Sequence, residues 1–513
     1  MASNLPCVSY RPYWGFTRMK VLVTGGTGVV GKGAVTELVR RGHSVRLLSR
    51  NAREDVAQWG EQVEPWPASV SEPEGIKGSA DGCDVVLHVA GIVSESPPEV
   101  TFDSVNVDGT RNMIQETERA GVGRFIYVSS LGAERGQSPY HQSKLRGEQI
   151  VKEFRGGWII LRPGNVYGPG DEVVSLLLKM VRTLPALPVI NGGSDRFQPV
   201  WVEDLSVAVA SAVERSDLHG RTLELAGEED TSIDDLLDRF AQLTGRNPSR
   251  IPIPGFIATA GAAIAGALGV ELPVNESQLT MLSEGNSIRT PGANALTGVF
   301  SIKPTTLEEG LKKLADAQPE QLPDDGIGPL KRKRIWADIS GSKLTPEQLF
   351  ERFRDDFDES TPGIVDAQIE PGTPVRLESG ATITMSLPVR GNVQVRVQEV
   401  TPVKATLVTV EGHPLAGAVR FLAEQRGDQV RFETQVYDRP ANIADWFAMK
   451  TVGESMQNRT WESVVQRMVD VSGGVAAKGI EQNEEDLDGQ QSDRIEEWLR
   501  DLVMERRRLE SMA

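Results

Sequence analysis

The sequence predicts an α/β protein with a doubly wound parallel sheet, followed by a second unit of the α+β class. From Lys20 onward, short apolar runs alternate with amphipathic stretches, which is typical of a parallel sheet covered by helices. The chain has 513 residues, whereas a domain usually has about 100–200. After residue 330, polar and apolar residues alternate within the strand-like runs, as in an antiparallel sheet with one wet face.

The first unit is expected to span residues 19–317. We predict a helix over 31–41 and another near 306–315, and strands at 20–24, 45–49, 84–90, 124–129 and 158–162. The strands are rich in Val, Ile and Leu on both faces, as expected of strands that helices cover on both sides. Residues 318–330 have the Pro, Gly and acidic composition of a linker.

The second unit is expected to span residues 331–475. Thr345 is a predicted N-cap with Pro346 at the first helical position, and this helix runs to Arg354. A further helix is predicted over 458–471, and strands at 381–387, 393–400, 405–410, 419–425 and 430–437.

Residues 476–513 are expected to form an acidic tail with a terminal amphipathic helix. Four apolar residues recur there at helical spacing, and we expect the helix that carries them to dock on another surface: Ile495, Trp498, Leu499 and Leu502.

Residues 1–18 are predicted to be a disordered leader, with Met19 as an alternative start. The longest apolar stretch, 257–270, is shorter than the roughly 20 residues of a membrane-spanning helix, so we expect no stable membrane insertion. The net charge of −17 opposes binding to nucleic acid. Only two cysteines are present, Cys7 and Cys83, which favours a cytoplasmic location and provides no thiolate metal cluster.

The basic run at 331–334 could indicate targeting or nucleic-acid binding. In so acidic a chain, we interpret it instead as a solvated domain edge.

A glycine-rich turn follows the first predicted strand. Gly25, Gly28 and Gly31 have the spacing G-x-x-G-x-x-G, and the turn leads directly into a helix. In this context the first glycine permits the turn, the second lets the backbone approach a pyrophosphate, and the third packs the helix on the strand. A merely structural glycine turn is the alternative. We therefore predict a dinucleotide site, to which Thr27 and Val29 in the same turn also belong.

The end of the second strand should select the cofactor. An acidic residue there would bind the ribose hydroxyls of NAD, but the chain has Arg50 and, three residues later, Arg53. Arg50 could pair with the 2′-phosphate of NADP; alternatively, both arginines are solvated loop residues. We expect NADP, with NAD as the alternative.

Tyr140 and Lys144 lie four residues apart, on one face of a predicted helix. A neighbouring ammonium and the cofactor's charge would lower the pKa of the tyrosine and make it a proton donor or acceptor. Such a pair is common by chance on solvated helices. Here it follows Ser130, which stands at the carboxyl end of a strand, where α/β sites form.

Together these motifs resemble the extended or atypical short-chain dehydrogenase/reductases of the NAD-dependent epimerase/dehydratase type. The resemblance covers residues 20 to about 315 and rests on the motifs at 24–31, 87–91, 106–110, 128–130, 140–144, 161–170 and 196–204. It implies a Rossmann-type fold and chemistry by hydride transfer.

The resemblance also implies roles for individual residues. Ser130 would polarise the substrate oxygen, Tyr140 would be the acid/base, and Lys144 would hold the nicotinamide ribose. Asn106 would be the structural or proton-relay asparagine, and Pro163 would lie near the nicotinamide. Val89 and Ala90, in the motif after the fourth strand, would line the cofactor.

Two features depart from this pattern or qualify it. Family members often have an acidic residue after the third strand that contacts adenine, whereas this chain has residues 68–70, Ala-Ser-Val. Arg50 is similar to an arginine of the atypical reductases and of the complex I accessory subunit, in which the fold binds NADPH for structure. Those structural relatives tend to lack the Tyr/Lys pair that this chain keeps.

The second unit resembles an uncharacterised family of START-like, helix-grip domains. The resemblance rests on residues 411–421, 431–433 and 439–441. It implies an antiparallel sheet around a long helix, often with an apolar cavity. His413 could line such a pocket, although a histidine before a proline in a turn is more often structural.

The sequence thus predicts an NAD(P)-dependent oxidoreductase or epimerase/dehydratase that acts on a hydrophobic or sugar-like small molecule; whether it forms a homodimer stays open. One alternative is a non-catalytic NADPH-binding scaffold or redox sensor. The other is a lipid-binding protein that uses its C-terminal domain.

Overall fold

The computed structural model describes residues 18–510, except 172, 184–185, 191–192, 254–285, 291, 358–365, 370–375, 388–390, 412 and 442–453. The predicted leader up to residue 17 and the apolar stretch 257–270 lie outside the described residues. The chain divides into two compact units. The first consists of residues 1–175, 189–236 and 252–313, and the second of residues 176–188, 237–251 and 314–513.

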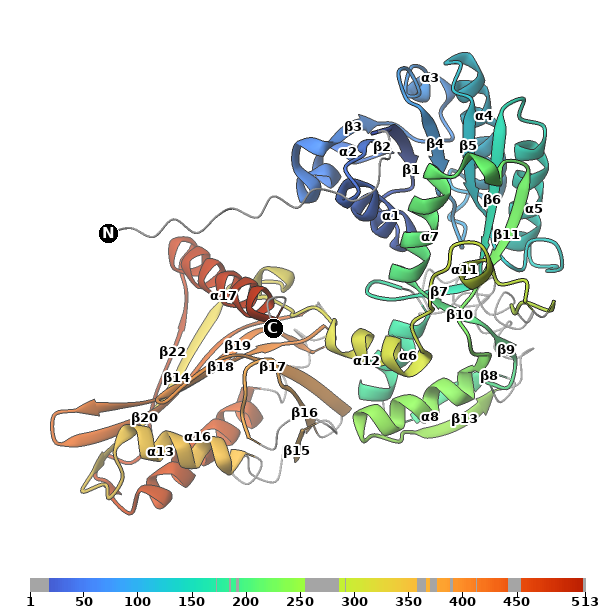
Figure 1. Cartoon of the computed structure of the whole chain (residues 1–513). Helices are drawn as coiled ribbons and strands as arrows, with labels where there is room; N and C mark the ends of the chain where they lie inside the picture. Colours follow the sequence, from blue (N-terminus) through green and yellow to red (C-terminus); the bar gives the residue numbers. More distant parts are fainter. Residues whose placement is uncertain are drawn as a thin grey trace, which may run out of the picture. The chain divides into compact units, whose positions relative to one another are not determined.

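A parallel sheet forms the centre of the first unit (Figure 1). In the described residues it has seven strands, which are, in sheet order, β11 (Arg221–Leu225), β6 (Gly157–Pro163), β5 (Arg124–Val128), β4 (Val85–His88), β1 (Lys20–Thr24), β2 (Ser44–Ser49) and β3 (Val63–Pro67). The strand order reverses at β1, between β4 and β2, which is the arrangement of a doubly wound Rossmann fold. This confirms the predicted fold class.

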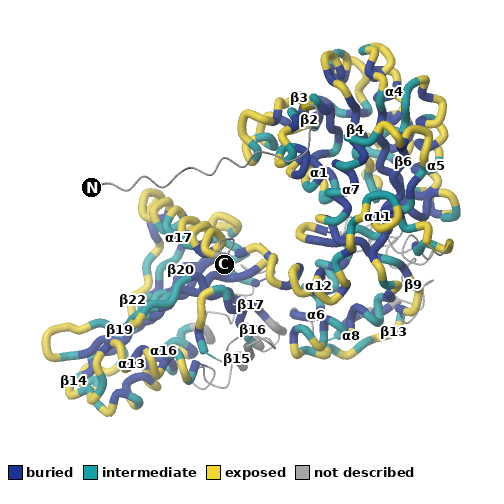
Figure 2. The backbone as a smooth tube through the Cα atoms, in the orientation of Figure 1, coloured by how far each residue is buried: buried dark blue, intermediate teal, exposed yellow. Residues whose placement is uncertain are grey.

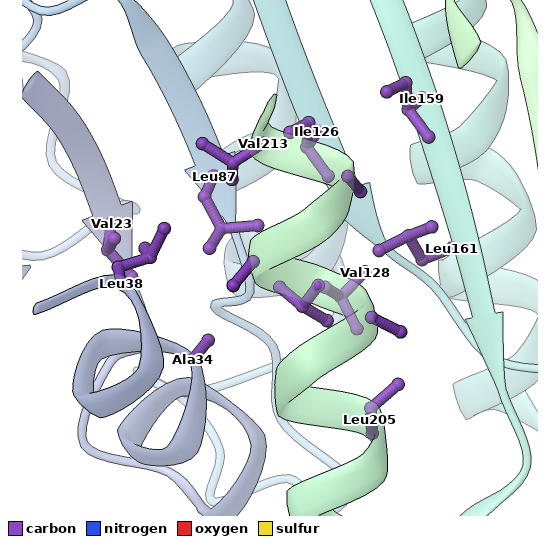
Figure 3. Packing of buried hydrophobic residues seen from close by; sticks show 14 of the residues in the cluster. Val23, Ala34, Leu38, Leu87, Ile126, Val128, Ile159, Leu161, Leu205 and Val213 are labelled. Atoms are coloured by element: carbon purple, nitrogen blue, oxygen red, sulfur yellow. The ribbon is translucent and has the colours of Figure 1, made fainter. Parts of the chain in front are cut away.

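Helices cover both faces of this sheet. On one face lie α1 (Val29–Arg40) and α7 (Val202–Glu214). Their side chains, including Leu38, Leu205 and Val213, pack against strand residues such as Val23 and Leu87 (Figure 3). On the other face lie α3 (Pro73–Ile76), α4 (Gly109–Arg119) and α5 (Pro139–Lys152), whose apolar residues pack on the alternate strand residues. The strand ends remain open, and the candidate site forms there.

Further elements lie between residues 52 and 316, and the parts of them within residues 176–188, 237–251 and 314–316 belong to the second unit. They are α2 (Ala52–Asp55), β7 (Asn165–Tyr167), α6 (Val174–Thr183), β8 (Ala186–Ile190), β9 (Arg196–Phe197), β10 (Pro199–Trp201), β12 (Thr231–Ser232), α8 (Ile233–Thr244), β13 (Ser249–Ile253), α11 (Ala295–Gly298) and α12 (Leu307–Asp316).

An antiparallel sheet dominates the second unit. In the described residues its strands are, in order, β15 (Asp366–Ile369), β16 (Thr382–Leu387), β17 (Gly391–Thr401), β18 (Lys404–Thr409), β19 (Leu415–Arg426), β20 (Gln429–Pro440), β14 (Lys331–Ser340) and β21 (Val475–Ala476), with β22 (Glu481–Asp486) also paired to β14. The helices are α13 (Pro346–Asp355), α16 (Glu454–Ser472) and α17 (Gly489–Glu510). The resemblance of this unit to START-like domains remains a prediction.

The helices lie on opposite faces of this sheet. Leu407 and Val419 share a core with the apolar residues of α13 and α16. Val408 and Ala418 alternate with them along the same strands, so they point to the other face, where Leu499 of α17 packs on them. The terminal amphipathic helix therefore docks, as expected, and Figure 2 shows the buried sheet between the helices.

Strands β14 and β22 join residues that the sequence assigned to a basic domain edge and an acidic tail. Residues 331–336 pair with residues 481–486 in antiparallel register. Lys331 contacts Glu484 at 3.1 Å and Arg332 contacts Glu485 at 2.5 Å, while Arg334 contacts Glu433 of β20 on the other side. The basic run thus lies in a strand paired on both sides, and acidic neighbours neutralise it.

Of the helices in the described part of the chain, none has an apolar stretch long enough to cross a membrane.

Candidate active site

A cavity of ≈710 Å³ opens at the carboxyl ends of the parallel strands of the first unit. Every residue that the sequence assigned to the cofactor lines it: Gly25, Thr27, Gly28, Val29, Gly31, Arg50, Val89, Ala90, Tyr140, Lys144 and Pro163. Ser130 lines it too, whereas Asn106 is buried behind the wall.

The glycine turn has the shape that a pyrophosphate needs. Gly25 has a φ of +69°, and a Cβ atom on it would come 2.5 Å from the backbone nitrogen of Ala90. A Cβ on Gly31 would come 2.0 Å from the carbonyl oxygen of Gly25, so this glycine lets α1 pack against the turn. A Cβ on Gly28, by contrast, would only approach the Gly25 oxygen at 3.6 Å and would occupy the cradle.

The N-terminus of α1 presents backbone N–H groups to this cradle. Its N-cap is Gly28, which has no side chain to satisfy them, and the helix begins with Val29, Val30 and Gly31. Free N–H groups and the helix dipole favour an anion at this position. The residues present therefore fit the pyrophosphate of a dinucleotide.

Two side chains of opposite charge follow β2 at this cavity. Arg50 is exposed and lines the wall, and Asp55, at the end of α2, lines it as well. The hydroxyl of Ser49 donates a hydrogen bond to the Asp55 carboxylate at 2.5 Å. Sequence reasoning considered the arginine but missed the aspartate, because α2 brings Asp55 back to Ser49 from six positions further along the chain.

The segment after β3 also lies at the wall, through residues 68–71. The hydroxyls of Ser69 and Ser71 lie 2.8 Å apart. This stretch offers backbone and hydroxyl groups where many relatives would offer a carboxylate.

Tyr140 is the second residue of α5, whose N-cap Ser138 accepts a hydrogen bond from the His141 backbone nitrogen. Burial raises the pKa of the Tyr140 phenol to about 12, and a hydrogen bond with Ser130 acts in the opposite direction. The expected lowering by Lys144 is not found. The phenol of the free protein is therefore protonated at neutral pH.

Lys144 explains this difference, because its ammonium is directed elsewhere. Its Nζ donates a hydrogen bond to the Val128 carbonyl at 2.8 Å and lies 4.9 Å from the centre of the Tyr127 ring. Burial lowers the pKa of Lys144 to about 8, while the carboxylate of Glu148 acts to raise it. Near neutral pH the lysine is mostly charged.

Asn106 lies in a π-helical turn, Asp103–Asp108, that leads into α4. Its Nδ2 donates to the Ile92 carbonyl at 3.1 Å and to the Ser143 hydroxyl at 2.9 Å, and its Oδ1 accepts from the Ile92 nitrogen at 2.8 Å. A Cβ on Gly91 would come 3.0 Å from the Lys144 Nζ and 3.2 Å from the Asn106 Oδ1. Asn106 thus braces the wall beside the lysine.

A buried histidine, missed in the sequence, links this asparagine to the glycine turn. Thr110 donates to the Asn106 carbonyl at 2.7 Å and accepts from Nε2 of His88 at 3.1 Å. Nδ1 of His88 then accepts from the Thr24 hydroxyl at 2.7 Å. Burial lowers the pKa of His88 to about 3, so the ring stays neutral and structural.

The rest of the described cavity wall combines apolar side chains with the polar residues Glu99, Asn165 and Asn286. Its apolar side chains come from segments that follow β4, from β7 and β9, and from α6 and the residue before it: Ile92, Val93, Val166, Val173, Val174 and Phe197. The carboxylate of Asp171, also at the wall, accepts hydrogen bonds from the backbone nitrogens of Val173, Val174 and Ser175. It therefore caps α6, and its charge is already satisfied.

His413 lies in a turn of the second unit. Its Nδ1 contacts the Leu415 carbonyl at 2.9 Å, and burial lowers its pKa to about 4. These contacts favour the structural interpretation of this residue.

The fold and this site define a dinucleotide-binding enzyme of the short-chain dehydrogenase/reductase class. Residues 21–226 match the model of the NAD dependent epimerase/dehydratase family. The chain belongs to this family, which supports a nicotinamide cofactor and an oxidoreductase or epimerase activity.

Three relatives illustrate the range of the similarity. A ceramide reductase of Caulobacter vibrioides is 33% identical over 249 residues, which cover 48% of this chain and 77% of that protein. Sterol demethylase protein B of Methylococcus capsulatus is 30% identical over 264 residues, 46% of this chain and 78% of that protein. The mitochondrial NADH dehydrogenase [ubiquinone] 1 alpha subcomplex subunit 9 of Arabidopsis thaliana is 26% identical over 278 residues, 52% of this chain and 69% of that protein.

Proposed function

We propose that the protein is an NADPH-dependent oxidoreductase that interconverts a hydroxyl and an oxo group on an apolar small molecule. The observation that carries the proposal is the position of Ser130, Tyr140 and Lys144. All three line one cavity, whose wall includes the glycine cradle and a set of apolar side chains.

A bound nicotinamide dinucleotide would supply or accept the hydride. The chain's own residues would do the rest. Ser130 and Tyr140 would hydrogen-bond the reacting oxygen of the substrate, and Tyr140 would donate the proton during reduction, since its phenol is protonated at neutral pH. Lys144, which is mostly charged near neutral pH, would hold the ribose of the bound cofactor.

Arg50 supports NADP as the cofactor, because an exposed guanidinium at the end of β2 can pair with the 2′-phosphate. Asp55 opposes it, because its carboxylate lines the same cavity and is bound to Ser49. Arg50 is exposed at the cavity wall, whereas Asp55 already accepts a hydrogen bond from Ser49. We therefore keep NADP as the proposal.

The lining favours an apolar substrate over a nucleotide sugar. Of the described residues at the cavity wall, the cationic ones are Arg50 and Lys144, and both are assigned to the dinucleotide. A nucleotide-sugar pyrophosphate would need cations of its own. The names of two relatives, a ceramide reductase and a sterol demethylase protein, agree with a lipid-like substrate.

A substrate panel tests this proposal. Purified full-length protein would be assayed for NADPH oxidation with long-chain 3-oxo compounds and 3-oxosteroids, and for conversion of UDP-glucose in parallel. We expect turnover with at least one apolar ketone and none with UDP-glucose. Epimerisation of UDP-glucose without activity on ketones would contradict the proposal.

A non-catalytic NADPH-binding scaffold is the second candidate, and the similarity to the NADH dehydrogenase subunit favours it. The lipid-binding alternative has less support. In the described part of the second unit, Phe353 packs ring to ring on Phe350, Phe421 and Phe432, where a lipid pocket would have to open.

A further inference from the structure

Glu148 is a fully buried carboxylate one helical turn after Lys144 on α5. It makes a bidentate ion pair with Arg162 of β6, whose Nε and Nη2 donate to it at 2.8 and 2.7 Å. It also accepts a hydrogen bond from the Ser129 hydroxyl at 2.7 Å. A buried carboxylate of this kind is costly unless it is paired, so its place beside the site calls for an explanation.

The contacts of Glu148 and Lys144 alternate along the end of β5. The Val128 carbonyl accepts a hydrogen bond from Lys144, and the hydroxyl of the next residue, Ser129, donates one to Glu148. Ser130 lines the cavity together with Val128 and Ser129. The backbone nitrogen of Ser129 donates to the Leu161 carbonyl of β6 at 2.7 Å, directly before Arg162. Glu148 therefore joins α5, β5 and β6 at the point where Ser130 emerges.

The charge of Glu148 also acts on the lysine. Burial favours the neutral amine of Lys144, and Glu148 opposes this effect. The other groups near the lysine cannot do so: Tyr127 and Tyr140 have raised pKa values and stay neutral, and His88 stays neutral as well. Arg162 and Lys152, which both form ion pairs with Glu148, are themselves cations and would favour the neutral amine.

We propose that Glu148 is a positioning residue of this site, whose carboxylate holds Lys144 in the ammonium form and fixes Ser129 so that Ser130 faces the cavity. The proposal rests on the proposed function for its catalytic meaning, but the effect on Lys144 can be measured without a substrate.

Lysine-selective ¹³C NMR of the full-length protein would give the pKa of Lys144, with its signal assigned by loss in Lys144→Arg. The wild-type amine should titrate near pH 8. In Glu148→Gln, which keeps the shape and removes the charge, we expect the pKa to fall by about one unit or more. An unchanged or higher pKa would overturn the proposal.

Glu134→Gln is the matched control. Glu134 binds the same arginine, at 2.6 Å from Nη1, but its side chain is 65% exposed. The pKa of Lys144 should be unchanged in this variant. An equal fall of the Lys144 pKa in both variants would mean that losing either carboxylate partner of Arg162 is enough. The specific role of Glu148 would then be wrong.

Glu148→Asp covers the case in which the glutamine variant does not fold. It keeps the charge but retracts it by one methylene, so the Lys144 pKa should lie between those of the wild type and a charge-free site. The pH midpoint of NADPH binding, followed by fluorescence, should move with the NMR value. If the Lys144 pKa changes in the variants as expected but the wild type turns over no substrate, the oxidoreductase proposal is rejected and the role of Glu148 stands.

Discussion

Arg50 and Asp55 place opposite charges at the part of the cavity that follows β2. The arginine could be predicted from the sequence because it stands where the ribose hydroxyls of a dinucleotide are read. The aspartate could not, since only the short helix α2 returns it to Ser49. We therefore propose that cofactor choice depends on both residues rather than on the arginine alone.

Replacing Arg50 by Ala should therefore weaken NADPH binding by about 10- to 100-fold, the value of one charge-assisted hydrogen bond, and leave NADH binding nearly unchanged. Asp55→Asn should instead raise the affinity for NADPH relative to that for NADH, because it removes a charge that repels the 2′-phosphate. Isothermal titration of both cofactors measures this. Equal losses of NADPH and NADH affinity in Arg50→Ala would refute an NADP preference.

Glycine spacing and the Tyr-Lys pair made most of the candidate site predictable, because both motifs are local in sequence. His88 and Glu148 were missed for the opposite reason. Each acts through partners on other elements, Thr24 and Thr110 for the histidine and Ser129 and Arg162 for the glutamate. The raised pKa of Tyr140 was also unforeseen, because it follows from burial of the phenol in the folded protein.

Among the elements, α17 shows how a helix far along the chain completes a sheet. Leu499 is fully buried against Val408 and Ala418, and the Trp498 ring packs on Tyr437 with ring centroids 5.8 Å apart. The helical spacing predicted this docking. Strands β14 and β22 were not predicted, since a run of basic residues and a run of acidic ones have low strand propensity alone and become favourable only when paired.

Leu499→Ala should lower the free energy of unfolding of the second unit by about 2–5 kcal/mol, the cost of truncating a buried leucine. Met504, on the same helix, is 61% exposed, and Met504→Ala should change it by less than about 0.5 kcal/mol. Urea unfolding followed by tryptophan fluorescence compares the two. Similar, small effects would mean that α17 does not rest on the sheet.

At the scale of the whole molecule, the chain has two units with separate cores. The sequence predicted both fold classes from the pattern of apolar residues along the strands. Apolar and polar residues alternate with a period of two in the antiparallel sheet, whereas the strands of the parallel sheet are continuous apolar runs. It could not give the strand order of the second sheet, where β14, the first strand in sequence, lies between β20 and β22. That order depends on contacts between distant residues.

Because the cradle lies in the first unit, NADPH should stabilise that unit selectively. Calorimetry of the full chain should show two unfolding transitions, and NADPH at about 100 times its Kd should stabilise one of them by about 2.7 kcal/mol. Leu499→Ala should lower the temperature of the other transition, which belongs to the second unit. A single transition that shifts as a whole would show instead that the two units unfold together.

Tyr140→Phe provides the most direct test of the central claim, that this cavity is the active site of a nicotinamide-dependent oxidoreductase. The variant removes one hydroxyl and leaves the cradle untouched, so NADPH affinity should stay within about twofold of the wild type. Turnover on the best apolar ketone should fall by about 10²-fold or more, the usual contribution of a positioned proton donor. Unchanged turnover in a variant that still binds NADPH would contradict the account.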